Sequence, residues 1–454
     1  RQDKRPMLSD LRDCLAGDVL VANADTGERV RMADIVQQRL RFNVWGVDER
    51  LKLVRRPITD AWEVATKPVF RVNTRSGRSI RCTAGHRFLT ASGWKELSDI
   101  AIGEPIAAPR RYAPPQWSSG EISTGKALLL GWLIGDGYLG GSAALTVASE
   151  GDAKLAASLA HAEFGLRPII KPERPDTPAL RVVLSTGTLC GAGKNPLTTW
   201  LRGLGIWKCT GQRKHIPREI FSQSDEVVAA FLRGLFHADG SLTRARNATG
   251  VTVRLATISE RLARDVQHLL LRFGINACLQ RDVRNIGGFR TTTKALWTVW
   301  IGERGAAATF MDKIGFLGEK HAIAAGKILS EKENDASRFD RIPLQFNERV
   351  RRLKEGRGLS HAALGWRDQG KRMSRARCAM IAERLDDEEL AALAYSDVLW
   401  DDIVAVEPDG VEAVYDLTVG DVHNFCVEDV VTHNSGAIEQ EADIVAFLYR
   451  DAYY

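Results

Sequence analysis

The chain has 454 residues, of which 44% are hydrophobic and 26% charged, and its formal net charge is +6. This composition is typical of a globular protein with two or three domains and excludes a disordered chain. No apolar run reaches the roughly 18 residues that a membrane-spanning helix needs. Seven cysteines without a CxxC pair argue against a disulfide framework or a zinc site. We therefore expect a cytoplasmic protein, and the charged first ten residues predict no signal peptide.

The two ends of the chain share one style of sequence. Residues 14–100 contain short β-type runs separated by Gly and Asn turns, among them CLAGDVLVA and VFRVNTRSGRSIRCTAGH. Residues 400–434, which begin WDDIVAVEPDG and end VVTHN, show the same pattern of short β-type runs and turns. Two β-rich pieces that flank a segment of different composition predict one β domain interrupted by an insertion.

The middle of the chain contains an internal repeat. LLLGWLIGDGYL (128–139) is similar to FLRGLFHADGSL (231–242), and each copy is followed by strand-like runs and an amphipathic helix. Within each helix two small residues lie four positions apart, so they share one face and allow two helix backbones to approach closely. Each helix is predicted to end at an Asp-Gly pair, where glycine suits a helix C-terminus.

Packing of the two repeated helices predicts a pair of carboxylates, Asp136 and Asp239, at one end of the helix pair. Two carboxylates so placed repel each other unless a cation lies between them, and hard oxygen ligands suit Mg²⁺. A divalent metal beside a phosphate is an arrangement for phosphodiester hydrolysis. The alternative is a pair of core helices with simple capping turns.

Positive charge concentrates in the same region. Residues 201–300 contain 16 Lys and Arg and 7 Asp and Glu, so this block carries +9 and the remainder of the chain −3. A basic block on a nearly neutral chain suggests a nucleic-acid partner, and a solvated basic face is the equal alternative.

Residues 345–395 have the pattern of several short amphipathic helices with many basic residues. KEGRGLSHAALG followed by MSRARCAMIAERL is similar to a helix-turn-helix, which would add DNA contacts. A helical linker with basic residues on its surface is the simpler interpretation.

Near the C-terminal end, the tetrapeptide THNS (432–435) follows a β-type run. Asn and Ser are common in turns and helix caps. However, an Asn side chain can also cyclise onto its own backbone carbonyl, so Asn434 marks a site where the chain could be cut.

The repeat resembles the LAGLIDADG homing endonucleases in the form that has both motifs in one chain. The resemblance covers roughly residues 115–325 and implies a pseudo-twofold αββαββα core, sheets in the DNA major groove, and Asp136 and Asp239 as metal ligands. QRKHIPREI resembles the lysine-bearing segment between the motifs, which makes Lys214 a candidate active-site residue. Lys320 is a weaker second candidate.

The β-rich ends resemble the splicing domain of inteins, a horseshoe-shaped β fold shared with hedgehog autoprocessing domains. CLAGD supplies Cys14 as the first residue, TAGH supplies Thr83 and His86, and VYDLTVGDVHNF supplies Asp416 and His423. VVTHNS supplies His433 and Asn434, with Ser435 as the first residue after the junction.

The resemblance implies roles that fit the chemistry of these side chains. Cys14 attacks the preceding carbonyl to form a thioester, and His86 protonates the departing amide while Thr83 orients the scissile peptide. Ser435 then attacks the thioester, with Asp416 handling protons. Cyclisation of Asn434, assisted by His433 and His423, frees Ser435. The other strand-like cysteines, Cys82 and Cys426, are expected to be buried thiols.

The flanks beyond the junctions, residues 1–13 and 435–454, join to form KRPMLSDLRDSGAIEQEADIVAFLYRD. This resembles the motor domain of the bacterial replicative helicase. The resemblance implies an ATP-dependent host that acts as a homohexamer, whereas the intein itself is expected to be monomeric. GAGKN (191–195) lacks the residues of a phosphate-binding loop, so the chain itself is not predicted to be a helicase.

We therefore predict an α+β multidomain protein, in which an all-β horseshoe splicing domain is split by an αββαββα endonuclease. The function predicted is autocatalytic splicing plus cleavage of double-stranded DNA at an intein-less helicase gene with Mg²⁺, and splicing itself needs no cofactor. The alternative is a splicing-only intein whose second domain binds DNA but is inactive. The expected division is 1–13 and 435–454 as host flanks, 14–113 and 397–434 as the splicing domain, 114–325 as the endonuclease, and 326–396 as the helical segment.

Overall fold

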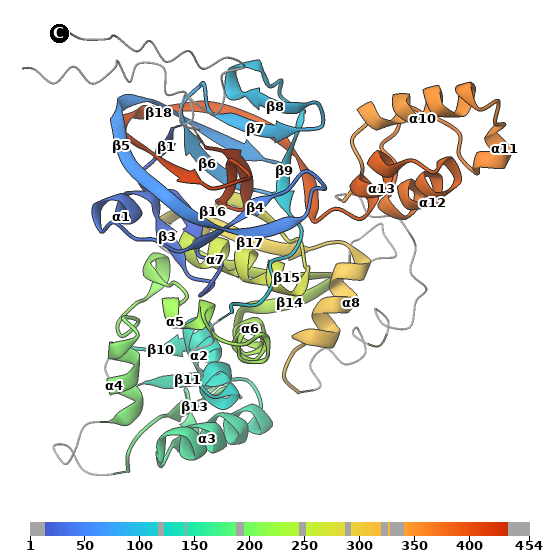
Figure 1. Ribbon diagram of the computed structural model, residues 1–454. Helices are drawn as coiled ribbons and strands as arrows, with labels where there is room; N and C mark the ends of the chain where they lie inside the picture. The colour runs from blue at the N-terminus through green and yellow to red at the C-terminus, as the bar shows by residue number, and fades with distance from the viewer. Residues whose placement is uncertain are drawn as a thin grey trace, which may run out of the picture.

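The computed structural model of the chain describes residues 14–116, 122–140, 143–187, 195–244, 251–286, 292–318, 326 and 340–434. Host flanks, Lys320 and most of GAGKN lie outside the described residues. Figure 1 shows a large β structure, an α/β unit beside it, and a helical lobe that projects from the β structure. Among the described residues, no helix combines the length and apolarity needed to cross a membrane.

The β structure is one twelve-stranded sheet built from both ends of the chain. Its strands are β1 (Leu15–Ala16), β2 (Leu20–Ala22), β3 (Arg29–Arg31), β4 (Asn43–Val47), β5 (Leu53–Thr74), β6 (Ser79–Cys82), β7 (Arg87–Thr90), β8 (Gly93–Glu96), β9 (Pro105–Pro109), β18 (Val398–Val419), β19 (Asn424–Val427) and β20 (Val430–His433). Helix α1 (Met32–Gln37) and the 3-10 turn η2 (Leu97–Asp99) accompany them.

Two long strands join the separated pieces. β5 and β18 each have 22 residues and pair antiparallel from Ile58–Val419 to Thr74–Ile403, with four register shifts along the ladder. Both strands are rich in Val, Thr and aromatic residues, which favour a pleated surface. Register shifts bend a strand, and Figure 1 shows the two strands curving around the smaller ones. The expected interrupted β domain is therefore present.

The α/β unit (residues 122–318) has the same order of elements twice. The first copy is α2 (Thr124–Asp136), β10 (Gly137–Tyr138), β11 (Ala144–Val147), α3 (Glu150–Phe164), β12 (Ile169–Pro172), β13 (Leu180–Val183) and α4 (Pro196–Gly203). After η3 (Gly211–Arg213) and α5 (Arg218–Phe221) come α6 (Asp225–Asp239), β14 (Gly240–Arg244), β15 (Val251–Thr257), α7 (Glu260–Leu270), η4 (Leu271–Phe273), β16 (Cys278–Ile286), β17 (Thr292–Ile301) and α8 (Arg304–Lys313).

Each half of this unit forms its own four-stranded sheet, ordered β10-β11-β13-β12 and β14-β15-β17-β16. One continuous hydrophobic core contains side chains from both halves. The helix–strands–helix unit, predicted twice from the similar sequences 128–139 and 231–242, is present, and so is the αββαββα order that the resemblance implies.

The small residues of α2 and α6 bring the two helix backbones into contact. A Cβ added at Gly131 would lie 1.9 Å from the carbonyl oxygen of Phe231, and one at Gly234 would lie 2.1 Å from that of Leu128. The side chains of Ser123 and Ser224 accept hydrogen bonds from backbone amides in the first turns, so both helices begin with a polar cap.

Glycine is required after each helix for a different reason from the C-terminal cap that was expected. Gly137 and Gly240 have φ of −74° and −88°, so neither is a left-handed cap. A Cβ at either position would lie 2.2 Å from a carbonyl oxygen of the preceding turn. Close backbone approach therefore requires these glycines.

The helical lobe consists of α10 (Gln345–Gly356), α11 (His361–Leu364), α12 (Arg375–Leu385) and α13 (Glu388–Ala394). The helices predicted in residues 345–395 are present. However, α11 is a single turn and residues 365–374 separate it from α12, whereas a helix-turn-helix has a connection of about 3–4 residues.

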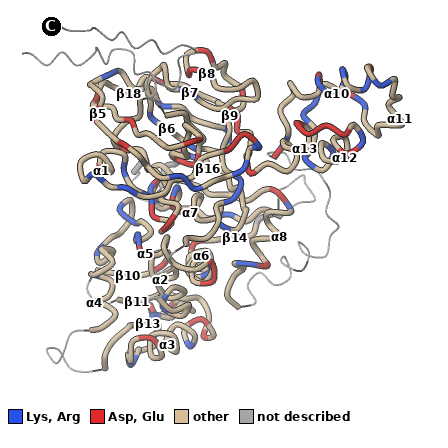
Figure 2. Tube along the Cα trace, viewed as in Figure 1, with Lys and Arg blue, Asp and Glu red and all other residues tan. Residues whose placement is uncertain are grey.

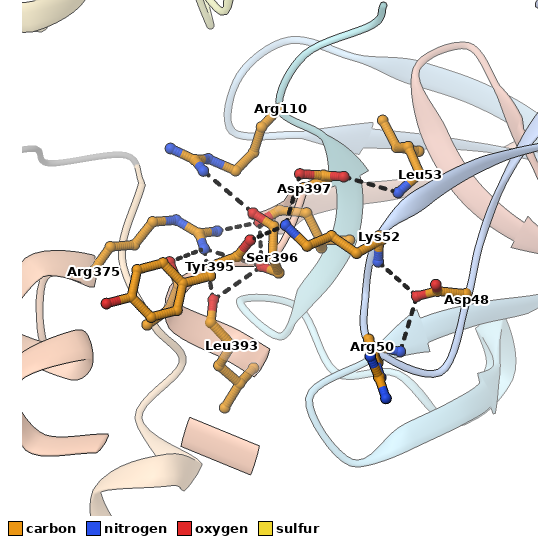
Figure 3. Close-up of polar contacts among 12 residues, drawn as sticks. Asp48, Arg50, Lys52, Leu53, Arg110, Arg375, Leu393, Tyr395, Ser396 and Asp397 are labelled. Carbon is orange, nitrogen blue, oxygen red and sulfur yellow. Dashed lines mark hydrogen bonds and ion pairs between the residues drawn. The ribbon is translucent and has the colours of Figure 1, made fainter. Parts of the chain in front are cut away.

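A short segment after α13 fixes the lobe to the sheet (Figure 3). The guanidinium of Arg375 donates to the carbonyl of Leu393 at 2.7 Å and to the hydroxyl of Ser396 at 3.0 Å. Asp397 accepts from the amide of Leu53 at 3.1 Å, at the start of β5. A hydrophobic cluster shared by the lobe and the sheet continues this contact.

Candidate functional site

Cys14, the predicted first junction residue, is fully buried just before β1. Its carbonyl oxygen accepts from the backbone amide of Thr83 at 3.0 Å and from the Thr83 hydroxyl at 3.4 Å. Thr83 follows β6, whose Cys82 pairs with Leu15. Strand pairing thus places the TAGH segment against the start of the domain, 69 positions away in sequence.

Two charged groups lie near Cys14. The ammonium of Lys67, in β5, is 3.8 Å from the Cys14 sulfur. β1 pairs with β18 so that Leu15 faces Tyr415, and the register therefore places Cys14 beside Asp416. Asp416 is buried, and its carboxylate accepts from the amide of Leu417 at 2.8 Å.

Lys67 was not identified from the sequence. It lies in EVATKPV (63–69) of β5, which mixes polar and apolar residues, and nothing in that pattern distinguishes it from a solvated lysine. Only the path of β5 past β1 brings its side chain to the sulfur.

His86 is fully buried at the end of the TAGH segment, directly before β7. Its backbone amide donates to the carbonyl of Thr83 at 3.2 Å, which makes a tight turn. The imidazole contacts the ring of Phe88 edge-on, with centroids 5.2 Å apart.

The second junction is carried by the hairpin of β19 and β20. Asn434 follows β20 and is fully buried. Its backbone amide donates to the carbonyl of His423 at 3.1 Å, while neither atom of its side-chain amide has a hydrogen-bond partner in the described part of the chain. An amide that is buried without partners is unusual, because such groups are normally satisfied. It leaves the side-chain nitrogen available for attack on its own carbonyl.

Two histidines flank Asn434. His433 packs edge-on against Trp94, with ring centroids 4.9 Å apart. His423 has φ of +50°, in the left-handed region, and its Nδ1 is buried without a partner among the described residues. Such backbone geometry is uncommon outside glycine and is found at functional sites.

The two junctions meet along β7. Thr432, two residues before Asn434, pairs with Phe88, two residues after His86. Hence the Cys14–Thr83–His86 group and the His423–Asn434 group lie on neighbouring strands. Ser435 lies outside the described residues. Cys82 and Cys426 are buried as expected, and burial raises the pKa of the Cys426 thiol.

A second group of polar residues lies at the ends of α2 and α6. Asp136 and Asp239 are the last residues of these helices, and a side-chain hydrogen bond links them. Burial raises the pKa of Asp239 to about 6, with Lys214 opposing that shift and Asp136 adding to it. The Lys214 ammonium also donates to the carbonyl of Gly135, so all three predicted residues converge.

The carboxylate pair is chemically suited to a hard divalent cation. Two carboxyl groups in contact need a proton or a cation between them, and carboxylate and carbonyl oxygens are the ligands that Mg²⁺ takes. No group of three or more His, Cys, Asp or Glu side chains that could hold a metal occurs in the described ranges. Asp136 and Asp239 are the side chains at these helix ends that would hold such a cation.

Comparison with protein families identifies the class of the β structure. The family described as the intein splicing domain matches residues 21–434. The chain therefore belongs to the intein splicing domain family. The αββαββα unit lies within the matched residues, between the two parts of the β structure.

Two similar proteins are replicative DNA helicases. It is 40% identical over 474 residues to the replicative DNA helicase DnaB of Rhodothermus marinus, covering 100% of this chain and 49% of that protein. It is 37% identical over 478 residues to DnaB of Nostoc sp., covering 100% and 53%. The chain spans about half the length of the curated relatives it matches.

Two kinds of solved structure are also similar. A DnaB intein from Synechocystis sp. PCC 6803 is 38% identical, with a TM-score of 0.21, over 21% of this chain and 69% of that one. Variants of the homing endonuclease I-DmoI are 20% identical, with a TM-score of 0.28, over 42% and 95%.

Proposed function

We propose that this chain excises residues 14–434 from itself and joins Asp13 to Ser435, within a replicative helicase. The proposed division is the one expected from the sequence: 14–113 and 397–434 splice, 114–325 act on DNA, 326–396 form the helical segment, and 1–13 and 435–454 belong to the host. The observation that carries the proposal is the pairing of Thr432 with Phe88, because it brings the segments on either side of the insertion into one site.

The first half of the reaction uses the residues around Cys14. The Cys14 sulfur attacks the Asp13 carbonyl carbon, the Asp13–Cys14 carbon–nitrogen bond breaks, and a thioester forms. The departing nitrogen takes a proton, for which His86 is the nearest titratable group in the TAGH segment. Thr83 fixes the Cys14 carbonyl through its amide and hydroxyl.

The second half uses the residues around Asn434. The Ser435 hydroxyl attacks the thioester carbonyl, which releases the Cys14 thiol and leaves a branched ester, with Asp416 beside Cys14 accepting protons. The Asn434 side-chain nitrogen then attacks the Asn434 carbonyl, and a succinimide forms as Ser435 departs. His433 and His423 supply protons to that leaving amine. The freed amine attacks the ester to give the Asp13–Ser435 peptide bond.

The experiment is a mass measurement of the expressed chain and two variants. The unaltered chain should yield an excised fragment of residues 14–434 and a ligated product. Asn434→Ala should block release at Ser435 but still permit cutting after Asp13 by dithiothreitol, because the thioester forms upstream of the Asn step. Cys14→Ala combined with Asn434→Ala should remain intact, and any cleavage of that double variant would reveal another nucleophile.

A second proposed activity is Mg²⁺-dependent cleavage of double-stranded DNA by the αββαββα unit. Its support is the convergence of Asp136, Asp239 and Lys214 at the helix ends. When bound, Mg²⁺ would supply Lewis-acid stabilisation of phosphate charge. Asp136 and Asp239 would hold it, and Lys214 would offset negative charge at Asp239. The alternative is a unit that binds DNA without cutting it, which a cleavage assay separates.

Double-stranded DNA is the partner we propose for the helical lobe as well. Between residues 341 and 384 there are twelve Lys and Arg but four Asp and Glu, and Figure 2 shows positive residues along α10 and near α11. A cavity of about 620 Å³ at the start of α12 is lined by cations and by no carboxylate; the cations are Arg341, Arg367, Lys371, Arg372 and Arg377.

The charges in this cavity are not all neutralised by the protein. Arg372 pairs with Asp402 at 2.6 Å, but no carboxylate of the described residues pairs with Arg367, Lys371 or Arg377. Cations of this kind contact DNA phosphates without regard to base sequence. The lobe would thus extend the DNA-binding surface.

We place the protein in the cytoplasm, with a monomeric intein and a hexameric spliced host.

A further inference from the structure

The hairpin that carries Asn434 turns at two residues with unfavourable backbone geometry. Glu428 and Asp429 connect β19 to β20, and their φ values are +48° and +58°. A two-residue hairpin turn with positive φ at both positions strongly favours Asn-Gly or a similar pair. Because Glu and Asp do not favour this conformation by themselves, other contacts must stabilise the turn.

One set of contacts comes from α7 of the α/β unit. The Asp429 carboxylate lies 2.7 Å from His268 Nδ1 and accepts from the Tyr112 hydroxyl at 3.1 Å. All three residues are buried, with Asp429 6% exposed and His268 3% exposed. Burial alone would raise the pKa of Asp429, but the hydrogen bond and charge of His268, together with Arg29, keep that pKa well below its ordinary value. The turn therefore contains the Asp429 carboxylate, whose negative charge is stabilised by His268 of the insertion.

Glu428 is connected to the same helix through an arginine. Its carboxylate accepts from the amide of Leu20 at 2.8 Å and pairs with the Arg29 guanidinium at 2.6 Å. Arg29 also contacts Asp265 of α7 at 3.4 Å. Figure 1 shows α7 on the side of the α/β unit that faces the large sheet.

The Glu428 amide donates to the carbonyl of Leu20 at 3.0 Å, but in the described part of the chain the hairpin has little other backbone support. β19 pairs with β2 only at Val427–Val21, and β20 pairs with β7 only at Thr432–Phe88. A hairpin with one bridge on each side can shift or tilt unless its turn is fixed. Asn434 follows directly on β20, so a shift of the turn would move the amide that must reach its own carbonyl.

We propose that α7 positions Asn434 for cyclisation, through contact of His268 with Asp429 and of Asp265 with Arg29 and Glu428. His268 and Asp265 are positioning residues, since neither touches the reacting atoms. The proposal rests on the splicing activity proposed above and adds to it: the insertion takes part in the second splice step. The first step does not depend on this contact, because Cys14 is held by Thr83 and by strands β6 and β18.

The test measures each half-reaction separately in the full chain. His268→Ala in a Cys14→Ala background leaves cleavage after Asn434 as the one measurable cut. Its rate should fall by on the order of tenfold to a hundredfold, as expected when a reacting group is displaced by about 1 Å. His268→Ala in an Asn434→Ala background reports dithiothreitol cleavage after Asp13, which should stay within about twofold of its value with His268 present.

Three further variants make the result decisive. His161→Ala changes an exposed histidine of α3 and should affect neither rate. Tyr112→Phe removes one hydroxyl and should slow the Asn434 step less than His268→Ala does. Adding His268→Ala to Asp429→Ala should cause no additional slowing, because the two residues act as a pair.

Failure of the proposal would be distinct from failure of splicing. If His268→Ala slows both half-reactions equally, the contact stabilises the fold and does not position Asn434. If it slows neither, the turn is fixed by other means. If the unaltered chain cuts at neither junction, the proposed function itself is wrong.

Discussion

Lys67 places a positive charge 3.8 Å from the Cys14 sulfur in an otherwise buried site. A thiolate is the nucleophilic form of cysteine, and a neighbouring ammonium stabilises it. At the other junction the arrangement is different, since the Asn434 amide is a neutral nucleophile with no hydrogen-bond partner among the described residues. In the proposed mechanism, the two junctions would therefore differ: a neighbouring charge would assist Cys14, whereas the Asn434 amide would be free of competing hydrogen bonds.

Lys67→Met should therefore slow the first step selectively. In an Asn434→Ala background, we expect dithiothreitol cleavage after Asp13 to fall by roughly tenfold, with partial recovery at higher pH as the thiolate forms without help. Lys95→Met, at a lysine that pairs with Glu104 in the same domain, is the matched control. An unchanged rate for Lys67→Met would mean that the thiol is activated by another group.

At the scale of elements, the close contact of α2 and α6 determines where Asp136 and Asp239 lie. Gly131→Ala should destabilise the α/β unit by about 1–3 kcal/mol, because the added carbon would lie 1.9 Å from a backbone oxygen and the helices must separate. Thermal unfolding measures this change, and DNA cleavage should fall with it. Gly203→Ala, in α4 with no atom within 4 Å of the added carbon, should be neutral or slightly stabilising. Equal stability of both variants would contradict the packing described.

The elements differ in how far the sequence predicts them. The repeat of small residues in α2 and α6, and the acid at each end, follow from a pattern within about twelve residues. The contact between His268 and Asp429 joins positions 161 apart, and Lys67 reaches Cys14 because β5 and β1 both pair with β18. Such contacts depend on the path of the chain, and no local pattern reports them. The reason for Gly137 was also misjudged, since a sequence does not distinguish positive φ from close backbone approach.

The helical lobe gives a prediction about DNA affinity. Replacing Arg367, Lys371 and Arg377 by alanine should weaken binding to double-stranded DNA and reduce the slope of log affinity against log salt by up to about 3, one for each phosphate that is no longer neutralised. A charge-matched control replaces three exposed cations outside the lobe, Arg41, Arg50 and Lys154. The same salt slope in both triple variants would show that the cavity does not bind DNA.

At the scale of the whole molecule, the residues proposed for splicing and those proposed for DNA cleavage lie on separate elements. The carboxylate pair is at the C-terminal ends of α2 and α6, whereas the contact with the splicing hairpin is made by α7. Variants of the carboxylates should therefore lose DNA cleavage and keep splicing, whereas variants of α7 should slow splicing and keep DNA cleavage.

Asp136→Ala or Asp239→Ala should abolish DNA cleavage, by at least about a hundredfold, while splicing stays near its normal rate. Each change removes one of the two carboxylates available to Mg²⁺, and splicing requires no metal in the proposed scheme, so chelation should spare splicing as well. The substrate is an uninterrupted helicase coding sequence spanning the Asp13–Ser435 join, since an inserted copy would split the recognition site. Binding to this DNA should persist, because basic side chains make most backbone contacts.

Asp312→Ala, at an exposed aspartate of α8, controls for the change in charge. Continued cutting by Asp136→Ala in Mg²⁺ would remove the carboxylate pair from the proposed endonuclease site. Failure of splicing in that variant would instead mean that the ends of α2 and α6, and not α7 alone, transmit structure to the hairpin that carries Asn434.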